Sequence, residues 1–473
     1  MKDEAFLIKD GVLLDFDGPQ AEVVVPDGVT EIGEKAFSSF RAIHSRPLPG
    51  GDTRTGVIPQ LWNTGTVESI RLPEGLTAIR ARGFSENVRL KEIRLPDTLS
   101  ELGRNAFTGC EALERVRMPR SLSGLGAGAF SDCRSLKEIC LPGDLTAIGE
   151  YTFSYCTCLE ELALPEGLTE LGNHAFFNCT ALKSIRIPTG VTRIEPFAFA
   201  RCTALEAVEL PDTVTEIGES AFAGCAKLTK LRLPRNLRII EDRAFSGCVS
   251  MQEAELSESV EQVGCCAFMG CAGLRSLRIS ENLRSIGGGA FTGCLMLQNV
   301  EISPENPDYT FHDHALFTEH DTVLVCYTES FSCTYRVPDS VTVLAPFAFS
   351  WCLTLNRVEL PRGLSEIQDE AFSGCRHLRE ILLPESVRWI GDSAFFDCRS
   401  LSCITVPEGV TEIRFATFGN CTALGWAALP STVRLIEENA FLNCTGLVCL
   451  AVPSGCEIGE NAIPYTCRER TDL

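Results

Sequence analysis

Several features common in other protein classes are missing from this chain. No apolar run approaches the roughly 18 residues needed to span a bilayer, so we expect no membrane span. Positive charge is in deficit, since 42 Lys and Arg oppose 63 Asp and Glu for a formal net charge of −21. Lys and Arg supply most of the affinity for nucleic acid and for anionic lipid. The acidic balance therefore opposes both partners and indicates a solvated surface.

Complete catalytic motifs are also missing. The chain has no Gly-x-Ser-x-Gly nucleophile elbow. The glycine run from Gly287 to Gly289 has no Gly-Lys-Ser or Gly-Lys-Thr after it, so it does not indicate a phosphate-binding loop. Carboxylates at repeated positions have the pattern of solvated faces. We therefore predict a protein that is not an enzyme and needs no cofactor.

Histidine is scarce, with only six residues, but three of them cluster: His312, His314 and His320. Asp313, Glu319 and Cys326 lie nearby. His-x-His can supply zinc ligands when further ligands converge, although no Cys-x-x-Cys pair accompanies it. The alternative is a hairpin with polar turn residues, in which His314 stands where the N-terminal segment has Gly11. We predict no metal site and keep a metal-dependent enzyme as the distant alternative.

The N-terminus indicates a location. The segment MKDEAFLIKDGVLLDF has acidic residues where a secretory signal is basic, and it lacks an apolar h-region. With Met at position 1, this predicts a cytoplasmic protein. The alternative is a secreted or cell-surface protein from which a signal peptide was trimmed.

A 23-residue repeat dominates what is present. Its consensus is close to L-x-x-I-x-L-P-x-x-L-x-x-I-G-x-x-A-F-x-x-C-x-x. The phenylalanine anchors are Phe37, Phe84, Phe107, Phe130, Phe153, Phe176, Phe199, Phe222, Phe245, Phe268, Phe291, Phe349, Phe372, Phe395, Phe418 and Phe441. Such self-similarity decides the architecture before local propensity does, because stacked repeats share one continuous core that no single repeat can form.

The I-x-L segment of each repeat has the alternation of a short strand, as in Ile93-Arg94-Leu95. Proline follows this segment in fourteen of the sixteen units and ends the strand, because it has no amide donor. Two residues before the strand isoleucine, the charge alternates through Glu68, Lys91, Glu114, Lys137, Glu160, Lys183 and Glu206. Parallel strands in register would place these opposite charges side by side. We therefore predict a β-rich solenoid with a parallel sheet of short strands.

These residues resemble a known family. The pattern LPEGLTAIGxxAFxGCxxLxxIxLP is the hallmark of BspA-type leucine-rich repeats, and FLIKDGVLLDFDG…VVVPDGVTEIGEKAF is similar to their opening module. The resemblance covers nearly the whole chain. It implies a right-handed horseshoe or superhelix with the I-x-L strands lining one face. For function it implies protein–protein interaction or adhesion, often at bacterial surfaces, where host or matrix components would be the partners.

Breaks in the period define five predicted segments. These are a capping module with the first repeat (1–40), an insertion loop (41–66), a repeat array (67–302), an elongated hairpin unit (303–336) and a second array with a C-terminal cap (337–473). The insertion is rich in Gly, Pro, Arg and Thr and is either functional or merely tolerated. Alternation from Thr322 to Val325 predicts a β-hairpin that projects from the coil and forms a joint between the arrays.

Fourteen of the 24 cysteines occupy one repeat position. They are Cys110, Cys133, Cys156, Cys179, Cys202, Cys225, Cys248, Cys271, Cys294, Cys352, Cys375, Cys398, Cys421 and Cys444. Stacking would bring neighbouring Cα atoms to about 4.8 Å, within reach of a disulfide. Parallel Cβ directions resist that bridge, however, and free cysteine is a small, readily buried hydrophobe. We predict a ladder of packed thiols, with disulfides or metal as the minority alternative.

The outward strand positions are not uniform along the chain. Early strands carry Arg and Glu, whereas the C-terminal third has an uncharged stripe. It comprises Leu382, Cys403, Thr405, Trp426, Ala428, Cys449 and Ala451. Exposed apolar patches mark interaction sites, and tryptophan is a common hot spot. We predict that this stripe binds a protein partner or a second copy of the chain, unless a C-terminal cap from Asn461 to Leu473 covers it.

Overall fold

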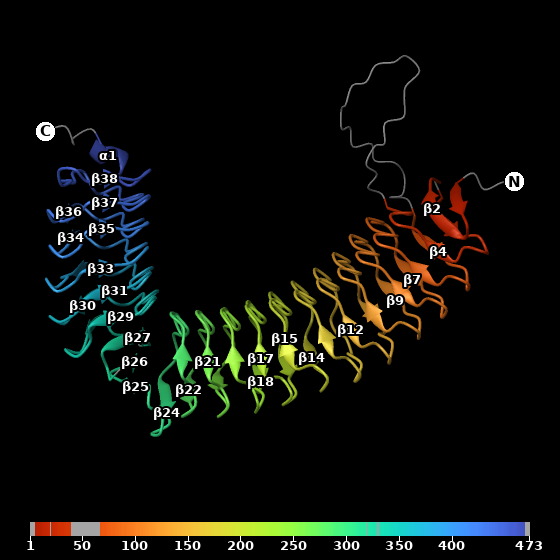
Figure 1. Ribbon diagram of the computed structural model, residues 1–473, viewed down its shortest axis with the longest axis horizontal. Coiled ribbons are helices and arrows are strands. Elements are labelled where there is room, and N and C mark those ends of the chain that lie inside the picture. Colours follow the sequence, from red (N-terminus) through yellow and green to blue (C-terminus); the bar gives the residue numbers. More distant parts are fainter. Residues whose placement is uncertain (1–4, 19, 39–66, 319, 329–330, 469–473) are drawn as a thin grey trace, which may run out of the picture. The chain divides into compact units, whose positions relative to one another are not determined.

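The fold of the protein comes from a computed structural model. It describes residues 5–18, 20–38, 67–318, 320–328 and 331–468. The chain forms two compact units, Met1–Leu237 and Arg238–Leu473, which we call the N-terminal and C-terminal units. Each unit is a β-solenoid, in which one repeat makes one coil and neighbouring coils stack (Figure 1).

The N-terminal unit has two rows of parallel strands. Row A contains the predicted I-x-L strands: β3 (Glu22–Val24), β5 (Ser69–Arg71), β7 (Glu92–Arg94), β9 (Arg115–Arg117), β11 (Glu138–Ile139), β14 (Ser184–Arg186), β16 (Ala207–Glu209) and β18 (Lys230–Leu231). Row B contains β4 (Glu31–Ile32), β6 (Ala78–Ile79), β8 (Glu101–Leu102), β10 (Gly124–Leu125), β12 (Ala147–Ile148), β13 (Glu170–Leu171), β15 (Arg193–Ile194) and β17 (Glu216–Ile217). An antiparallel hairpin of β1 (Phe6–Lys9) and β2 (Val12–Phe16) begins row B, because β2 pairs in parallel with β4.

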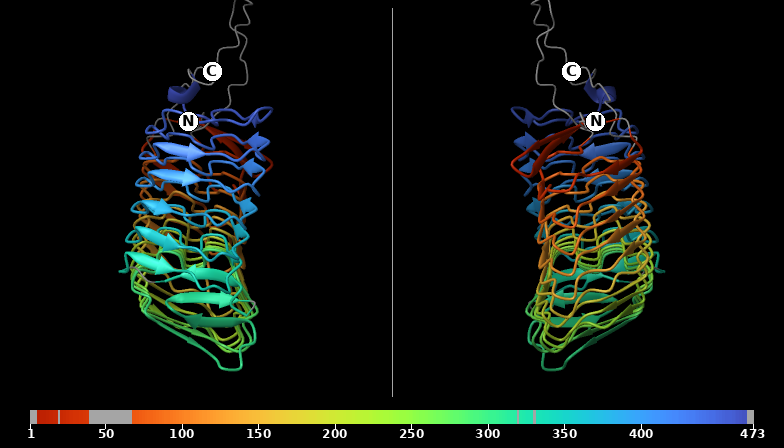
Figure 2. Two further views of the ribbon diagram at one scale, coloured as in Figure 1. Left: turned by 90° about the vertical axis from the view of Figure 1, so that its left-hand side faces the viewer. Right: turned by 90° about the vertical axis from the view of Figure 1, so that its right-hand side faces the viewer.

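The C-terminal unit repeats this plan, with one row of strands on each side of the coils (Figure 2). Row A contains β20 (Glu253–Glu255), β22 (Ser276–Ile279), β24 (Asn299–Ile302), β28 (Thr334–Arg336), β30 (Arg357–Glu359), β32 (Glu380–Ile381), β34 (Cys403–Thr405) and β36 (Trp426–Ala428). Row B contains β19 (Ile239–Ile240), β21 (Gln262–Val263), β23 (Ser285–Ile286), β29 (Val343–Leu344), β31 (Glu366–Ile367), β33 (Trp389–Ile390), β35 (Glu412–Ile413), β37 (Leu435–Ile436) and β38 (Glu457–Ile458). A single helical turn, α1 (Tyr465–Arg468), follows β38.

The solenoid of parallel strands confirms the predicted fold class. Row A has the expected register of whole repeats, as in Ile185↔Val208, whose side chains are both buried. Row B was not predicted as strand. Its residues, such as Ile79 and Leu102, were recognised only as apolar positions, because two residues are too few to show an alternation.

A turn before and after each phenylalanine adds a third ladder of hydrogen bonds between coils. Asn105 and Gly109 have φ angles of 56° and 72°, in the left-handed region. This conformation directs backbone N–H groups along the stack. Asn105 N–H donates to Ala127 O at 2.8 Å, and Gly109 N–H donates to Ser131 O at 2.9 Å. Neighbouring coils are therefore joined along this turn as well as by the strand pairs of rows A and B.

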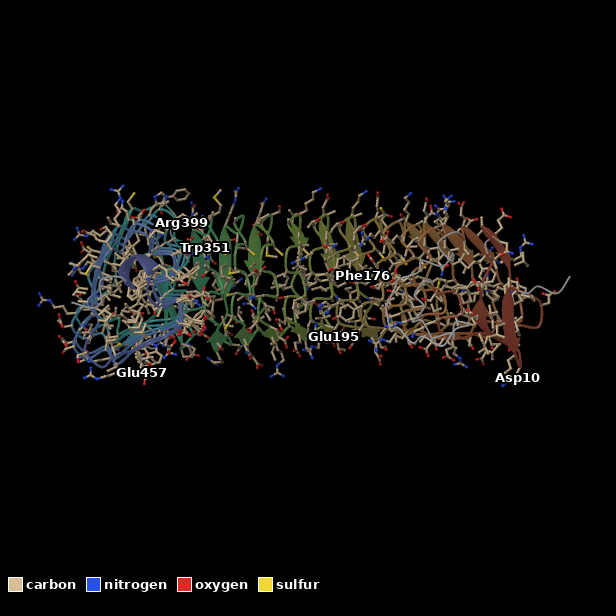
Figure 3. All side chains as sticks on the ribbon, turned by 90° about the horizontal axis from the view of Figure 1, so that it is seen from above. Asp10, Phe176, Glu195, Trp351, Arg399 and Glu457 are labelled. Atoms are coloured by element: carbon tan, nitrogen blue, oxygen red, sulfur yellow. The ribbon has the colours of Figure 1, made fainter. Side chains whose placement is uncertain are left out.

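The core is a stack of phenylalanine rings. Rings of successive coils in the N-terminal unit are nearly parallel, with centroids 5.5 Å apart for Phe107 and Phe130. The corresponding distance for Phe395 and Phe418 in the C-terminal unit is also 5.5 Å. Phe176 is fully buried and lies within its coil, away from the rim (Figure 3). Each such ring contributes about 1.5–3 kcal/mol through burial, and stacking adds roughly 0.5–1.5 kcal/mol.

The elongated unit differs from its prediction in one respect. It contains the antiparallel strands β25 (Tyr309–His312), β26 (Ala315–Thr318) and β27 (Val323–Tyr327), so the expected hairpin is present. It does not project from the coil, because β27 pairs in parallel with β29 in row B. Phe317 and Leu324 are fully buried in the core. Apolar residues on both faces of the hairpin explain why it joins the solenoid.

The predicted segment boundaries stay a prediction. The division into two compact units falls between residues 237 and 238, inside the stretch predicted as one array. The predicted insertion at 41–66 lies outside the described residues. Coils on either side of the hairpin unit touch directly, since Thr292 Oγ1 donates to Phe347 O at 3.4 Å.

Candidate interaction surface

Row A of the C-terminal unit positions the predicted apolar stripe. Strands β34 and β36 pair in parallel, with Cys403 opposite Trp426 and Thr405 opposite Ala428. Side chains alternate along each strand, so Ile404 and Ala427 point into the core and the stripe residues beside them point outward. A bridge between Ala427 and Leu450 continues the register to Cys449 and Ala451. The structure thus brings the predicted residues of three successive coils together.

The stripe is open to solvent. Leu382 is 80% exposed and Trp426 is 53% exposed. Cys403, Thr405, Cys449 and Ala451 are exposed as well, whereas Ala428 is half-buried. The described part of the C-terminal cap packs on the coil of Phe441, since Phe441 N–H donates to Ala462 O at 2.9 Å. This part of the cap leaves Trp426 uncovered.

Charged neighbours mark where the stripe begins. Arg357 on β30 lies 3.4 Å from Glu359 and 3.7 Å from Glu380, which is on β32. The outward residues of the later row A positions, from Leu382 to Ala451, carry no formal charge. Row A therefore changes from paired charges to an uncharged surface within one coil.

The N-terminal unit has paired charges immediately before its row A strands. The predicted alternation produces ion pairs between neighbouring coils. Lys91 Nζ lies 3.1 Å from Glu68, Lys137 Nζ lies 3.1 Å from Glu114, and Lys183 Nζ lies 2.5 Å from Glu160. These side chains are exposed, so each pair contributes about 0–1 kcal/mol. The pairs confirm the register that the sequence pattern predicts.

The ladder cysteines lie in the core and not at a surface. All fourteen are buried and are free thiols. Most donate their S–H to the backbone carbonyl of the phenylalanine anchor in the preceding coil, as Cys110 does to Phe84 O and Cys133 to Phe107 O, both at 3.2 Å. Burial raises the pKa of Cys110 and Cys271 to about 12. The ladder therefore consists of protonated thiols with a packing and hydrogen-bonding role.

Asn87 shows that this position requires a donor. It stands where the repeat has cysteine, and its Nδ2 donates to Phe37 O at 2.9 Å and to Phe84 O at 2.8 Å. Sequence reasoning missed this role, because it treated cysteine only as a small hydrophobe. The exchange of cysteine for asparagine at a buried position was the signal that could have revealed it.

The histidine cluster is only partly assembled. His312 Nδ1 lies 3.1 Å from Asp313 and Nε2 lies 3.3 Å from Asp321, and its ring stacks on Phe317 with centroids 4.4 Å apart. Asp313 and His314 have φ angles of 48° and 59°, and the two residues form the turn between β25 and β26. Among the described residues, no group of three or more His, Cys, Asp or Glu has a metal-binding arrangement.

His314 occupies the position that the hairpin alternative assigned to it. Asp10 and Gly11 form the matching turn between β1 and β2, with φ angles of 51° and 80°. A two-residue hairpin turn of type I′ requires positive φ at both of its residues. His314 is therefore explained by the turn it forms.

Stacked coils with short parallel strands define the class of leucine-rich-repeat proteins. Within that class, the sequence model described as "BspA type Leucine rich repeat region (6 copies)" matches residues 59–183, 128–248, 192–318 and 338–468. The chain therefore belongs to the BspA-type leucine-rich-repeat family. In the part of the chain that the structure describes, every helix is too short or too polar to cross a membrane.

Solved structures of leucine-rich-repeat proteins are similar to this chain. A leucine-rich repeat protein from Eubacterium ventriosum is 23% identical over 60% of this chain and 82% of its own, with a TM-score of 0.51. One from Bacteroides ovatus is 29% identical over 77% and 88% of the two chains, with a TM-score of 0.48. A leucine rich cell surface protein from Faecalibacterium prausnitzii is 22% identical over 90% and 94%, with a TM-score of 0.41. A comparison with curated proteins gave no match.

Proposed function

We propose that this chain is a non-enzymatic scaffold that binds a protein partner through the apolar stripe from Leu382 to Ala451. The observation that supports this most is the exposure of Trp426 on β36 and of Leu382, the residue that follows β32. The side chains of Leu382 and Trp426 are not part of the core. Ile404 and Ala427 are the buried residues of strands β34 and β36. Tryptophan on an ordered strand gives a partner a large contact area at little cost in conformational entropy.

The double variant Trp426→Ala with Leu382→Asp tests this role. We expect association, measured by sedimentation for a second copy and by affinity capture for another protein, to weaken at least tenfold, while the thermal transition stays nearly unchanged. Val24→Asp is the matched control, because Val24 is a 59% exposed outward residue of row A in the N-terminal unit. If the double variant unfolds and the wild-type chain associates with nothing, the proposal fails.

Native cysteines allow the bound surface to be located. Cys403 and Cys449 flank Trp426 and are exposed, whereas Cys140 and Cys158 are exposed in the N-terminal unit. A partner bound to the stripe should slow alkylation of the first pair and leave the second pair unaffected. Protection of Cys140 and Cys158 alone would move the interface to the N-terminal unit and contradict the proposal.

A further inference from the structure

A cluster of aromatic residues on the turns of the N-terminal unit is separate from the stripe. We call it the aromatic ridge and define it as Tyr151, Tyr155, His174, Phe177 and Phe197. The rings of Tyr151 and His174 stack with centroids 4.5 Å apart, and those of His174 and Phe197 with centroids 4.6 Å apart. Tyr155 contacts Phe177 edge to face at 5.4 Å. Tyr151 and Tyr155 remain 45% and 42% exposed.

The backbone does not require these aromatic residues. Tyr151, His174 and Phe197 have φ angles near 56°, a conformation that disfavours bulky side chains. The same turn position holds Asn105, Gly128, Ser220 and Asn439 in other coils, with positive φ in each. Large residues also occur there, at Arg82, Arg243 and Phe347, so the position tolerates bulk. What distinguishes the ridge is an aromatic residue at this position in three successive coils, which indicates a role for the exposed rings.

Stacking within the ridge does not cover Tyr151. His174 lies against one face of its ring, and the preceding coil has Gly128 at this position. Gly128 has no side chain, and the carboxamide of Asn105 occupies the space where a side chain at Gly128 would lie. On the side that faces the coil of Gly128, Tyr151 therefore has no second ring stacked on it.

Carboxylates border the ridge on the same side. Asp132 occupies the turn position of Tyr155 in the preceding coil. One coil further back the position is Gly109, and the carboxylate of Glu86 extends over this glycine toward Asp132. Burial, together with the charges of Asp132 and Glu111, raises the pKa of Glu86. Arg134 already lies beside these carboxylates, with its Nε 2.7 Å from Asp132 and its terminal nitrogen 3.9 Å from Glu111. An added positive charge would relieve the repulsion among these carboxylates.

This chain shows which cation fits such a surface. The guanidinium of Arg201 already lies over Phe177 in the ridge, 5.6 Å from the ring centroid. Arg376 and Arg414 lie over Trp351 and Trp389 in the C-terminal unit, at 5.0 Å and 4.4 Å. A guanidinium stacks on aromatic faces and donates hydrogen bonds to carboxylates from the same planar group.

We propose that the aromatic ridge and its bordering carboxylates bind an arginine side chain of a basic protein segment. The open rings of Tyr151 and Tyr155 take the guanidinium plane, and Glu86 and Asp132 provide the opposing charge. The net charge of −21 favours approach of such a segment. This site goes beyond the stripe and uses different residues.

The test is a fluorescein-labelled peptide of alternating glycine and arginine, whose affinity is measured by anisotropy at physiological ionic strength. The variant Tyr151→Asn with Tyr155→Asn keeps the charge of the protein. It also uses a residue found at both turn positions elsewhere, at Asn105 and Asn178. We expect the peptide affinity to fall about tenfold, and we expect a lysine peptide of equal charge to bind the wild-type chain less tightly than the arginine peptide does.

Trp351→Asn is the matched control, because Trp351 is a 43% exposed aromatic residue at the turn position of Tyr155 in the C-terminal unit. It should leave the affinity unchanged. Equal affinity of the double variant and the wild-type chain would overturn the proposal. So would equal affinity for the lysine peptide, absence of binding, or tyrosine-dependent binding of the neutral sugar cellohexaose in place of the peptide. Thermal transitions of both variants establish that they fold.

Discussion

Each ladder cysteine is a buried residue that must also donate a hydrogen bond. The carbonyl of Phe107 accepts the N–H of Cys110 in its own turn and the S–H of Cys133 from the next coil, both at 3.2 Å. Alanine would fit the space but leave this second interaction unmade. A thiol is a weak donor that costs little to bury, so it satisfies the carbonyl without bringing a strongly polar group into the core.

Asn87 gives this explanation a direct test. Its Oδ1 is buried without a hydrogen-bond partner, a situation that costs about 1–3 kcal/mol. We expect Asn87→Cys to raise the free energy of unfolding by about 1 kcal/mol, because a thiol keeps a donor for Phe37 O and removes the unsatisfied oxygen. Asn87→Ala should lower it by about 1–3 kcal/mol, because both donated bonds are lost. Chemical denaturation measures both, and a cysteine variant less stable than the alanine variant would contradict the explanation.

Between coils, the turn segments are joined by side chains as well as by the backbone. Asp397 is an example, with a side chain only 7% exposed. Its two oxygens accept hydrogen bonds from Arg376 Nε of the preceding coil at 2.8 Å and from Arg399 Nε of its own coil at 2.7 Å. The Arg399 side chain projects at the rim of the coils (Figure 3). One carboxylate therefore links two neighbouring turns.

This link predicts a dependence of stability on pH. Burial acts to raise the pKa of Asp397, but hydrogen bonds from Arg399 and Arg376 outweigh it and lower the pKa below its usual value. A carboxyl whose pKa is lower in the folded chain stabilises it above the unfolded value of about 3.9 and loses that effect as the pH falls through the folded pKa. We expect Asp397→Asn to cost about 1–3 kcal/mol at pH 7 and progressively less below about pH 4.

Denaturation of the wild-type chain and the Asp397→Asn variant across this pH range measures the difference. Arg134 and Asp132 form a similar pair within one coil of the N-terminal unit, so Asp132→Asn is the matched control. A constant difference between wild type and Asp397→Asn down to pH 2 would show that charge is not what Asp397 contributes.

At the scale of the whole chain, the reactivity of the cysteines measures how well the stacked coils shield the core from solvent. Cys140, Cys158, Cys265, Cys333, Cys403 and Cys449 are exposed, and the ladder cysteines are buried. With a pKa of about 12, a thiol such as Cys110 is a thiolate in only roughly one molecule in ten thousand at pH 8. We expect alkylation of the native protein to modify the exposed set rapidly and to spare the ladder.

In denaturant without reductant, nearly all of the 24 thiols should react. The native protein in the same buffer is the control for exposure alone. Oxidation of most ladder cysteines in freshly purified protein would contradict both the packing role and the predicted cytoplasmic location, because disulfides persist in oxidising compartments.

The repeat by itself determined the fold class, the core columns and the row A register of this protein. A 23-residue period places the same apolar residues at the same depth in every coil, so Phe107, Ile93 and the ladder cysteines could be assigned to the core from spacing alone. The same period paired Lys91 with Glu68 and pointed Trp426 outward, because strand alternation is a local property. These features depend only on neighbours one repeat away.

Only the tertiary structure decided the row B strands, the course of β27 and the thiol donors. Row B strands of two residues carry no periodic signal, and β27 could join row B or project from it with the same sequence. The carbonyl that Cys110 reaches is 26 residues away, in a direction set by the left-handed turn. The exposure of Leu382 and the stacking of Tyr151 on His174 likewise depend on which side chains the neighbouring coils place beside them, since burial is a property of the assembled stack.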